Sequence, residues 1–339
     1  MALKLTAEVV TLTTKHPFTI ARGGRSEFRV VWVRLIDGDG LEGWGEADPS
    51  SYYGETADTV LEALRRLEMY LPSDAFDLEA AEMRFAQAAP ASRAARAALS
   101  AALHDLVGKR LAQPLYRVWG LDAVEAPLTS FTIGLDTPER MRDKVDEAEP
   151  YPVLKIKLGT DQDEEILRAV RAATYKPLRV DVNAGWTRER AMGMLPVLKE
   201  CNVELLEQPL APDDLEGLAA VRRAAAMPLI LDESCIVATD IPRVAGVADG
   251  INIKLAKCGS LREAIRMIAT ARAHGLFVMV GCMIETSLGI TAAAHVAPLA
   301  DAADLDGAAL TLDDPFVGAV IDGGRILLPD GPGLGVRRR

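Results

Sequence analysis

The chain has 339 residues, of which 49% are hydrophobic and 26% are charged, and its formal net charge is −11. This length and apolar content are typical of two packed domains rather than one ordinary core. The acidic balance argues against nucleic acid or an anionic membrane surface as a partner. No apolar run approaches the ~18 residues of a membrane-spanning helix, and the first residues lack a signal-peptide core. The four cysteines, at 201, 235, 258 and 282, form no C-x-x-C pair and are not expected to form structural disulfides, so we expect a cytoplasmic protein.

Residues 1–123 are predicted to form an α+β domain. Apolar and polar residues alternate over 28–36, and the Asp-Gly-Asp-Gly turn before the apolar run at 41–46 predicts an antiparallel hairpin. Residues 55–112 have apolar residues at helical spacing, and Pro90 should divide the stretch 79–108 into two helices.

From residue 124 the pattern changes to alternating strands and helices, which predicts a parallel sheet with right-handed crossovers. Seven or eight units over the ~190 residues of 124–314 suit a closed barrel better than an open sheet. The expected strands are 128–133, 153–158, 178–183, 203–207, 229–232, 250–255, 277–282 and a weaker one near Asp304. The short strand-like pieces of 315–339 should return to the N-terminal domain.

Charged residues stand at the C-terminal ends of five consecutive expected strands, separated by 22 to 26 residues: Lys157, Asp181, Glu207, Asp232 and Lys254. In a parallel barrel these strand ends converge on one mouth. A single acid at a strand end is more often a helix cap or part of a loop ion pair. Five such residues in order predict one site, with three carboxylates in the middle and a lysine on either side.

Three converging carboxylates repel one another and need a cation. Hard oxygen ligands favour Mg²⁺, and Mn²⁺ could substitute. No histidine stands at these strand ends, which argues against zinc.

The lysines supply the proton chemistry. Lys155 and Lys157 are two apart on one strand and therefore face the same side. Lys155 and the metal should lower the pKa of Lys157 and make it a general base. Lys254 arrives from the far side of the barrel, and Lys257 is interpreted as a solvated neighbour. The metal would hold a substrate carboxylate between Lys157 and Lys254 and stabilise the enediolate formed when an α-proton leaves.

These motifs resemble the enolase superfamily, muconate-lactonising subgroup, over essentially the whole chain. They are Lys155-Ile-Lys157, Asp181-Val-Asn183, Glu207-Gln-Pro, Asp232-Glu-Ser and Lys254-Leu-Ala-Lys-Cys-Gly. The resemblance implies a (β/α)7β modified TIM barrel with an α+β N-terminal capping domain, one Mg²⁺, and paired lysines on opposite faces of the substrate. It also implies a homo-oligomer.

Within that superfamily the sequence resembles the dipeptide epimerases, especially those of the L-Ala-D/L-Glu type. In such enzymes an Asp-x-Asp pair, here Asp304 and Asp306, holds the α-ammonium of the dipeptide. An arginine of the N-terminal segment, here Arg22 or Arg25, meets the side-chain carboxylate of the second residue. An ordinary acidic loop and a surface arginine are the alternative interpretations.

Two further segments match the same family. The residues expected near the substrate are Met283, Glu285 and Ser287 after the seventh strand, and Tyr53 (with Tyr52) in the capping loop 48–55. Closure of that loop would exclude water from the enediolate. Core packing and surface exposure are the alternatives for these residues.

The resemblance therefore implies a Mg²⁺-dependent dipeptide epimerase that inverts the α-carbon of the C-terminal residue, with a role in peptidoglycan recycling. An o-succinylbenzoate synthase, an N-acylamino-acid racemase or a cycloisomerase on the same scaffold is the alternative. A non-catalytic ligand-binding barrel is a more remote alternative function.

Overall fold

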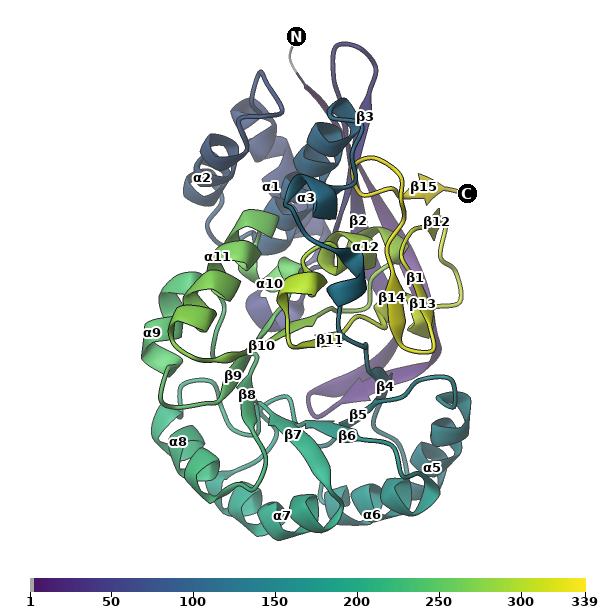
Figure 1. The fold of residues 1–339 in the computed structure, drawn as a ribbon, viewed down its shortest axis with the longest axis vertical. Coiled ribbons are helices and arrows are strands. Elements are labelled where there is room, and N and C mark those ends of the chain that lie inside the picture. The colour runs from purple at the N-terminus through teal and green to yellow at the C-terminus, as the bar shows by residue number, and fades with distance from the viewer. Residues whose placement is uncertain (1–2) are drawn as a thin grey trace.

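A computed structural model describes residues 3–339 and divides them into a cap and a barrel that pack against each other (Figure 1). The cap holds a three-stranded antiparallel sheet in the order β1-β2-β3. Its strands and its main helices are β1 (Lys4–Ile20), β2 (Gly23–Ile36), β3 (Glu42–Ala47), α1 (Ala57–Leu67), α2 (Leu78–Ala88), α3 (Arg93–Arg110) and α4 (Leu115–Val118). As expected, Pro90 lies in the break between α2 and α3.

Glycine lets the cap helix α3 lie directly on strand β3. A Cβ built on Gly43 would stand 2.1 Å from the carbonyl oxygen of Ala102, and one on Gly45 would stand 2.1 Å from that of Ala98. The Gly-x-Gly face of β3 and the alanine-rich face of α3 therefore pack backbone against backbone. This contact sets the distance between the sheet and the helix that covers it.

Eight parallel strands form the barrel, and they pair in the order of the chain. They are β4 (Phe131–Ile133), β5 (Leu154–Lys157), β6 (Leu178–Asp181), β7 (Val203–Glu207), β8 (Leu229–Leu231), β9 (Gly250–Ile253), β10 (Phe277–Gly281) and β11 (Ala302–Asp304). A parallel bridge between Thr129 and Ala303 joins the first strand region to the last and closes the barrel. The predicted (β/α)7β barrel with a capping domain is confirmed.

Helices cover the outside of the barrel in a ring (Figure 1). The ring consists of α5 (Pro138–Glu147), α6 (Asp163–Ala173), α7 (Arg188–Glu200), α8 (Leu215–Ala224), α9 (Ile241–Val244) and α11 (Leu261–Ala273). The short helix α10 (Leu255–Cys258) and helix α12 (Ser287–Ala294) follow strands β9 and β10 and contact the cap at α3 and β3. None of the helices described in residues 3–339 has the length and apolarity needed to cross a membrane.

Strand alternation separates the barrel core from the site. On β5, Leu154 and Ile156 belong to the main hydrophobic core, whereas Lys155 and Lys157 alternate with them and face the barrel interior. A small separate apolar cluster made by Leu205, Ile230, Met279 and Ala302 packs together from the strands. Two residues of this apolar cluster, Leu205 and Ile230, lie two positions before the charged residues Glu207 and Asp232 along the chain.

Two segments link the cap to the barrel. The tip of the β1–β2 hairpin, drawn in purple, reaches over to the barrel, where Leu135 N–H donates to Thr19 O (2.8 Å) (Figure 1). The short strands β12 (Phe316–Val317), β13 (Val320–Asp322), β14 (Arg325–Leu327) and β15 (Arg337–Arg338) form two two-stranded sheets. Leu334 N–H donates to Asp105 of α3 (2.8 Å), so the C-terminal segment contacts the cap. The boundaries 1–123, 124–314 and 315–339 stay predictions.

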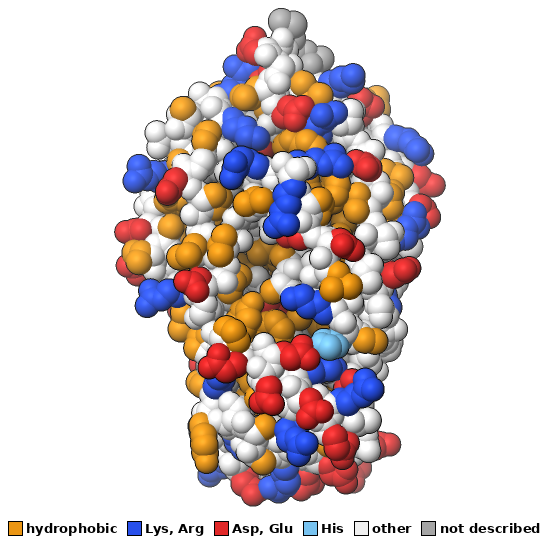
Figure 2. All heavy atoms as spheres, turned by 90° about the vertical axis from the view of Figure 1, so that its right-hand side faces the viewer, with side chains coloured by type: hydrophobic (Ala, Val, Ile, Leu, Met, Phe, Trp, Pro, Cys, Tyr) orange, Lys and Arg blue, Asp and Glu red, His pale blue; other side chains and the backbone are white. Residues whose placement is uncertain are grey.

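The face that carries the C-terminal strands is mixed in charge. Figure 2 shows acidic and basic side chains interspersed over it, with hydrophobic side chains gathered near its middle. The net charge of −11 is therefore not concentrated on this face.

Candidate active site

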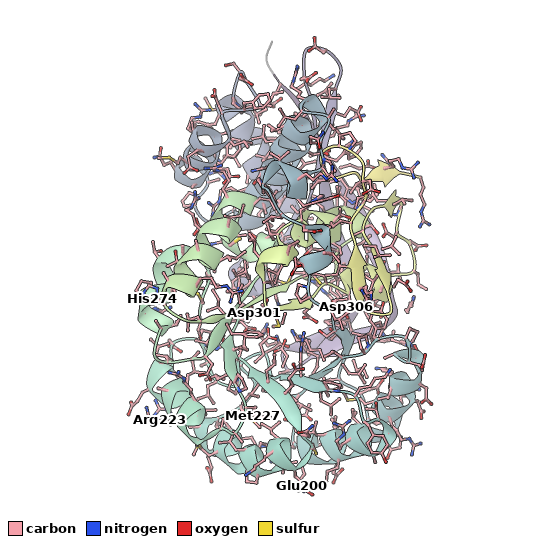
Figure 3. The ribbon with its side chains drawn as sticks, in the orientation of Figure 1. Glu200, Arg223, Met227, His274, Asp301 and Asp306 are labelled. Carbon is pink, nitrogen blue, oxygen red and sulfur yellow. The ribbon has the colours of Figure 1, made fainter. Side chains whose placement is uncertain are left out.

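A cavity of about 450 Å³ lies between the barrel mouth and the cap. The cap contributes the β1–β2 turn and the loop after β3, and the barrel contributes strand ends. Its charged lining residues include Lys155, Lys157, Asp232, Lys254, Asp304 and Asp306. Asp181 and Glu207 are fully buried and lie outside this lining. Figure 3 shows Asp306 in the middle of the molecule, far from Glu200 on the outer ring.

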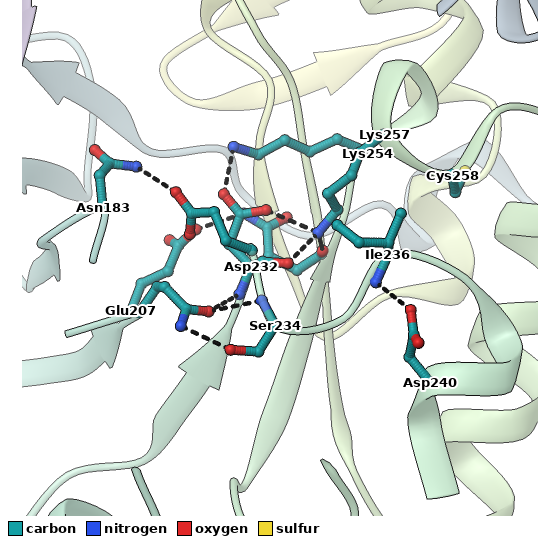
Figure 4. Close-up of polar contacts among 12 residues, drawn as sticks. Asn183, Glu207, Asp232, Ser234, Ile236, Asp240, Lys254, Lys257 and Cys258 are labelled. Atoms are coloured by element: carbon teal, nitrogen blue, oxygen red, sulfur yellow. Dashed lines mark hydrogen bonds and ion pairs between the residues drawn. The ribbon is translucent and has the colours of Figure 1, made fainter. Parts of the chain in front are cut away.

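The structure brings the predicted carboxylates and lysines into one network. Lys155 Nζ lies 3.1 Å from Asp181 Oδ2, 2.8 Å from Glu207 Oε2 and 2.7 Å from Asp304 Oδ2. Lys157 Nζ donates to Asp181 Oδ2 (2.6 Å), and Lys254 Nζ donates to Asp232 Oδ2 (2.8 Å; Figure 4). The two outer lysines thus contact different carboxylates of the set.

Charge compensation differs among the three carboxylates. Burial raises the pKa of Asp181, but the ammonium groups of Lys157 and Lys155 outweigh it and hold that pKa below its usual range. Burial is likewise outweighed at Asp232, where Lys254 and Lys257 lower the pKa. Burial and then the Asp181 carboxylate raise the pKa of Glu207 to about 7. Glu207 therefore has the least compensated charge of the three.

The donor set fits a hard divalent cation. Within residues 3–339, no three carboxylate, imidazole or thiol groups form a ready ligand cluster, and lysine ammonium groups lie against the carboxylates. Four buried oxygens in and beside this set nevertheless have no hydrogen-bond partner: Glu207 Oε2, Glu233 Oε2, Asn183 Oδ1 and Asn252 Oδ1. The contact of Glu207 Oε2 with Lys155 is short but lacks hydrogen-bond geometry. Unpartnered buried oxygens beside a carboxylate set are what Mg²⁺ would satisfy.

Asp304 and Asp306 lie on the same side of the cavity. Asp304 accepts bonds from Ser130 Oγ (2.6 Å) and Lys155 Nζ (2.7 Å). The Asp306 carboxylate accepts from the backbone N–H of Thr132 (2.5 Å) through Oδ2, and no lysine or arginine lies against it among the described residues. Burial, together with the Asp304 charge, raises the pKa of Asp306 to about 7. The pair can therefore take up a further cation such as an ammonium group.

The two candidate arginines occupy different environments. Arg22 Nη1 donates to Asn183 O and to Glu233 Oε1 (2.9 Å), and its guanidinium stacks on Tyr52 at 4.1 Å. Arg25 lies over the Phe28 ring at 4.2 Å and has no hydrogen-bond or ion-pair partner in residues 3–339. Both line the cavity. Arg22 links the cap to the barrel, whereas Arg25 keeps its donors available.

The remaining predicted residues divide into two groups. Tyr53 and Met283 line the cavity. Glu285 and Ser287 do not: Glu285 accepts from Met283 N–H (2.9 Å) in its own loop, and Ser287 Oγ donates to Asp314 (2.5 Å). These polar groups therefore bond Met283 and Asp314 and are not among the residues that line the cavity.

Sequence reasoning missed several supporting side chains. Lys257 is fully buried and bonded to Asp232, so its interpretation as a solvated neighbour is wrong. Asn252 Nδ2 donates to Glu207 Oε1 (2.8 Å), and Gln208 Oε1 accepts from Asp232 N–H (3.0 Å). The alternation of Asn252 and Lys254 on one strand was a signal that could have identified the first of these.

Two family models match the chain. The mandelate racemase / muconate lactonizing enzyme N-terminal domain matches residues 4–120. The model described as "Enolase C-terminal domain-like" matches residues 137–339. The matched segments correspond to the cap and to the barrel with its C-terminal segment.

Similar proteins include the L-Ala-D/L-Glu epimerase of Bacteroides thetaiotaomicron, 41% identical over 99% of this chain and 88% of that protein. The L-Ala-D/L-amino acid epimerase of Maribacter sp. is 39% identical over 98% of this chain and 99% of that protein. The structure of a dipeptide epimerase from Cytophaga hutchinsonii, complexed with Mg and D-Ala-L-Val, superimposes with a TM-score of 0.95 at 28% identity, covering 100% of this chain and 96% of the other. The chain therefore belongs to the mandelate racemase/muconate-lactonizing branch of the enolase superfamily, and it is an isomerase.

Proposed function

We propose that the protein is a Mg²⁺-dependent dipeptide epimerase that inverts the α-carbon of the C-terminal residue. One observation carries this proposal. Lys157, at the end of β5, and Lys254, just after β9, line the same cavity, and each bonds a different carboxylate of the central set. Two amines that approach one cavity from separate strands are the arrangement a 1,1-proton transfer needs.

Each lysine would serve one face of the substrate. One lysine, with a neutral Nζ, would take the α-proton and become an ammonium, and the other, as an ammonium, would give a proton to the opposite side and become neutral, which inverts the centre. Asp181, Glu207 and Asp232 would hold the cation, which supplies positive charge beside the substrate carboxylate when the α-proton leaves. Tyr53 and the capping loop would exclude water from the cavity.

The substrate ends would be recognised by charge. Asp306, which accepts from Thr132 N–H, and Asp304 would hold the N-terminal ammonium. Arg25, whose donors are available, would meet an acidic side chain on the second residue. This favours L-Ala-L-Glu or L-Ala-D-Glu as substrate and a setting in peptidoglycan recycling. One relative is named for L-Ala-D/L-Glu and another for L-Ala-D/L-amino acids. These names support a dipeptide substrate, but they do not single out Glu as its second residue.

Proton exchange tests the reaction directly. Incubation of the protein with L-Ala-L-Glu and Mg²⁺ in D₂O should place one deuterium on the α-carbon of the second residue and produce both epimers, as measured by mass spectrometry and chiral chromatography. A set of dipeptides with hydrophobic and basic second residues defines the breadth. If no dipeptide exchanges its α-proton, the epimerase proposal fails and the ligand-binding barrel is favoured.

Asp306→Asn separates the dipeptide reaction from that of an N-acylamino-acid racemase or an o-succinylbenzoate synthase, whose substrates lack a free amine. The amide can still accept the Thr132 N–H, so the fold should be retained. Loss of a charge-assisted bond of about 1.5–3 kcal/mol should lower kcat/KM for L-Ala-L-Glu by roughly 10- to 100-fold. An unchanged dipeptide rate in the folded variant would argue for the N-acyl or succinyl alternative.

A further inference from the structure

Lys257 is a buried charge whose bonds are all internal. It lies in the single-turn helix α10, is fully buried, and does not line the cavity. Its Nζ donates to Asp232 O (2.6 Å), Asp232 Oδ1 (2.7 Å) and Asn252 O (2.6 Å). An ammonium group has three donors, and here three acceptors take them. Lys257 therefore cannot touch a substrate, and its position is set by Asp232 and Asn252.

The two carboxylate oxygens of Asp232 bond different lysines. Oδ1 accepts from Lys257, while Oδ2 accepts from Lys254, which lines the cavity (Figure 4). The backbone of Asp232 is held as well, because its N–H donates to Gln208 Oε1 (3.0 Å) and its carbonyl accepts from Lys257. The carboxylate is thus left with one orientation, in which Oδ2 bonds the cavity-lining lysine.

Asn252 connects this arrangement to a second carboxylate. Its carbonyl accepts from Lys257, and its side-chain Nδ2 donates to Glu207 Oε1 (2.8 Å). Because Oε1 is taken, Oε2 is the oxygen of Glu207 that remains without a hydrogen-bond partner. Asn252 and Lys257 therefore orient two of the three carboxylates assigned to the cation, those of Glu207 and Asp232.

We propose that Lys257 is a positioning residue for the cation site: by bonding Asp232 Oδ1 and the Asp232 and Asn252 carbonyls, it orients the Asp232 carboxylate before the cation binds. This inference rests on the proposed function, which assigns Asp232 as a ligand. Partners that orient a metal ligand typically change metal affinity by 10- to 100-fold when they are removed. The cost of burying the ammonium is offset because every donor is bonded.

Mn²⁺ binding is the direct test, with free Mn²⁺ followed by electron paramagnetic resonance in the absence of substrate. Lys257→Met keeps the apolar stem and removes the ammonium. It should weaken Mn²⁺ binding by about 10- to 100-fold. Lys109 offers a matched control in the cap: its Nζ donates to a carbonyl, Glu42 O (2.7 Å), and to a buried carboxylate, Asp105 Oδ2 (2.7 Å). Lys109→Met should leave the Mn²⁺ affinity unchanged.

A double-mutant cycle shows whether Lys257 acts through Asp232. Lys257→Met is compared in the native protein and in Asp232→Asn, over a Mn²⁺ range extended to millimolar concentrations. Positioning is supported if Lys257→Met greatly weakens Mn²⁺ binding in the native protein but weakens it little further in Asp232→Asn. Equal losses in both would show general loosening of the site and overturn the inference. Where Lys257→Met does not fold by circular dichroism, Lys257→Gln, which keeps a neutral donor, takes its place in the same cycle.

Mn²⁺ binding by the native protein distinguishes failure of the proposed function from failure of the positioning role. If the native protein binds no Mn²⁺, the proposed cation site itself is wrong. If the native protein binds Mn²⁺ and the folded Lys257 variants bind it equally well, only the positioning role is overturned, and the proposed function stands.

Discussion

At the residue scale, the site depends on which donors and acceptors are already bonded within the protein. Lys257 and Arg22 are charged residues with their bonds directed at other parts of the chain. Asp306 and Arg25, by contrast, have few partners or none among the described residues and line the cavity. Residues of the second kind can bind a substrate without first breaking an internal bond.

Arg25→Gln should change substrate preference. If Arg25 bonds the acidic side chain of the second residue, its loss removes a charged hydrogen bond worth about 1.5–3 kcal/mol. The KM for L-Ala-L-Glu should therefore rise by roughly tenfold or more, while that for a dipeptide with an apolar second residue changes little.

The comparison is made by steady-state assays of both dipeptides on both variants. Arg22→Gln is the matched control, since it loses the bonds to Asn183 and Glu233 and should affect both substrates to a similar degree. If Arg22→Gln selectively loses activity on L-Ala-L-Glu and Arg25→Gln does not, then Arg22 rather than Arg25 binds the acidic side chain of the second residue.

At the element scale, the contact between β3 and α3 predicts a stability effect. In Gly45→Ala the new methyl group would meet the Ala98 carbonyl at 2.1 Å, so helix and strand must move apart. Overpacking of this kind costs about 1–3 kcal/mol. Urea unfolding followed by circular dichroism should show this loss in the midpoint.

Gly193 supplies the opposite case for the same substitution. It lies within α7, and a Cβ there would meet nothing within 4 Å. Gly193→Ala should therefore stabilise the protein by up to about 1 kcal/mol through helix propensity. If both variants shift stability in the same direction, steric contact at Gly45 is not the cause.

The joint between β3 and α12 should make stability depend on pH. Glu46 accepts from Trp32 Nε1 (3.0 Å) and Thr286 N–H (2.8 Å), which precedes α12. Burial, and next the Glu285 carboxylate, raise the pKa of Glu46 from 4.5 to about 8. Since the folded state binds a proton that the unfolded chain has lost, Glu46 should lower the free energy of unfolding as pH rises from 4.5 to about 8.

Glu46→Gln should flatten that part of the profile. The free energy of unfolding of Glu46→Gln should exceed that of the native protein by an amount that increases with pH and reaches a few kcal/mol. The scale is about 1.4 kcal/mol per unit of pKa difference between the folded and unfolded states. Thermal unfolding at several pH values measures the difference between the two proteins. Parallel profiles would show that Glu46 titrates alike in the folded and unfolded states.

At the scale of the whole molecule, cap and barrel enclose the carboxylate set jointly, so cation binding should stabilise the complete fold. Mg²⁺ at 100 times its dissociation constant should add about 2.7 kcal/mol to the free energy of unfolding. For a chain of this size we expect an increase in Tm of several degrees.

Differential scanning calorimetry with Mg²⁺ and with EDTA measures this shift. Asp232→Asn should lose most of it, because the variant lacks one of the assigned ligands. A shift that is equal in the native protein and in Asp232→Asn would mean that Mg²⁺ binds elsewhere.

The sequence by itself determined the barrel and the order of its charged strand ends. Parallel strands alternate with helices over short, regular intervals, so a residue such as Asp181 or Lys254 is placed at the mouth by local pattern and topology alone. The facing of Lys155 and Lys157 follows in the same way from the alternation along one strand.

Only the tertiary structure decided which charged groups are free and which are bonded. Lys257 meets Asp232 across 25 residues, Arg22 meets Glu233 across 211, and Glu46 meets Thr286 across 240. Local sequence patterns carry no information about such contacts, because they depend on how the strand ends of the barrel meet one another and on how the cap docks on the barrel. Arg25 lines the cavity with no side-chain hydrogen bond among residues 3–339, whereas Glu285 bonds Met283 and Ser287 bonds Asp314, and only the folded chain distinguishes these environments.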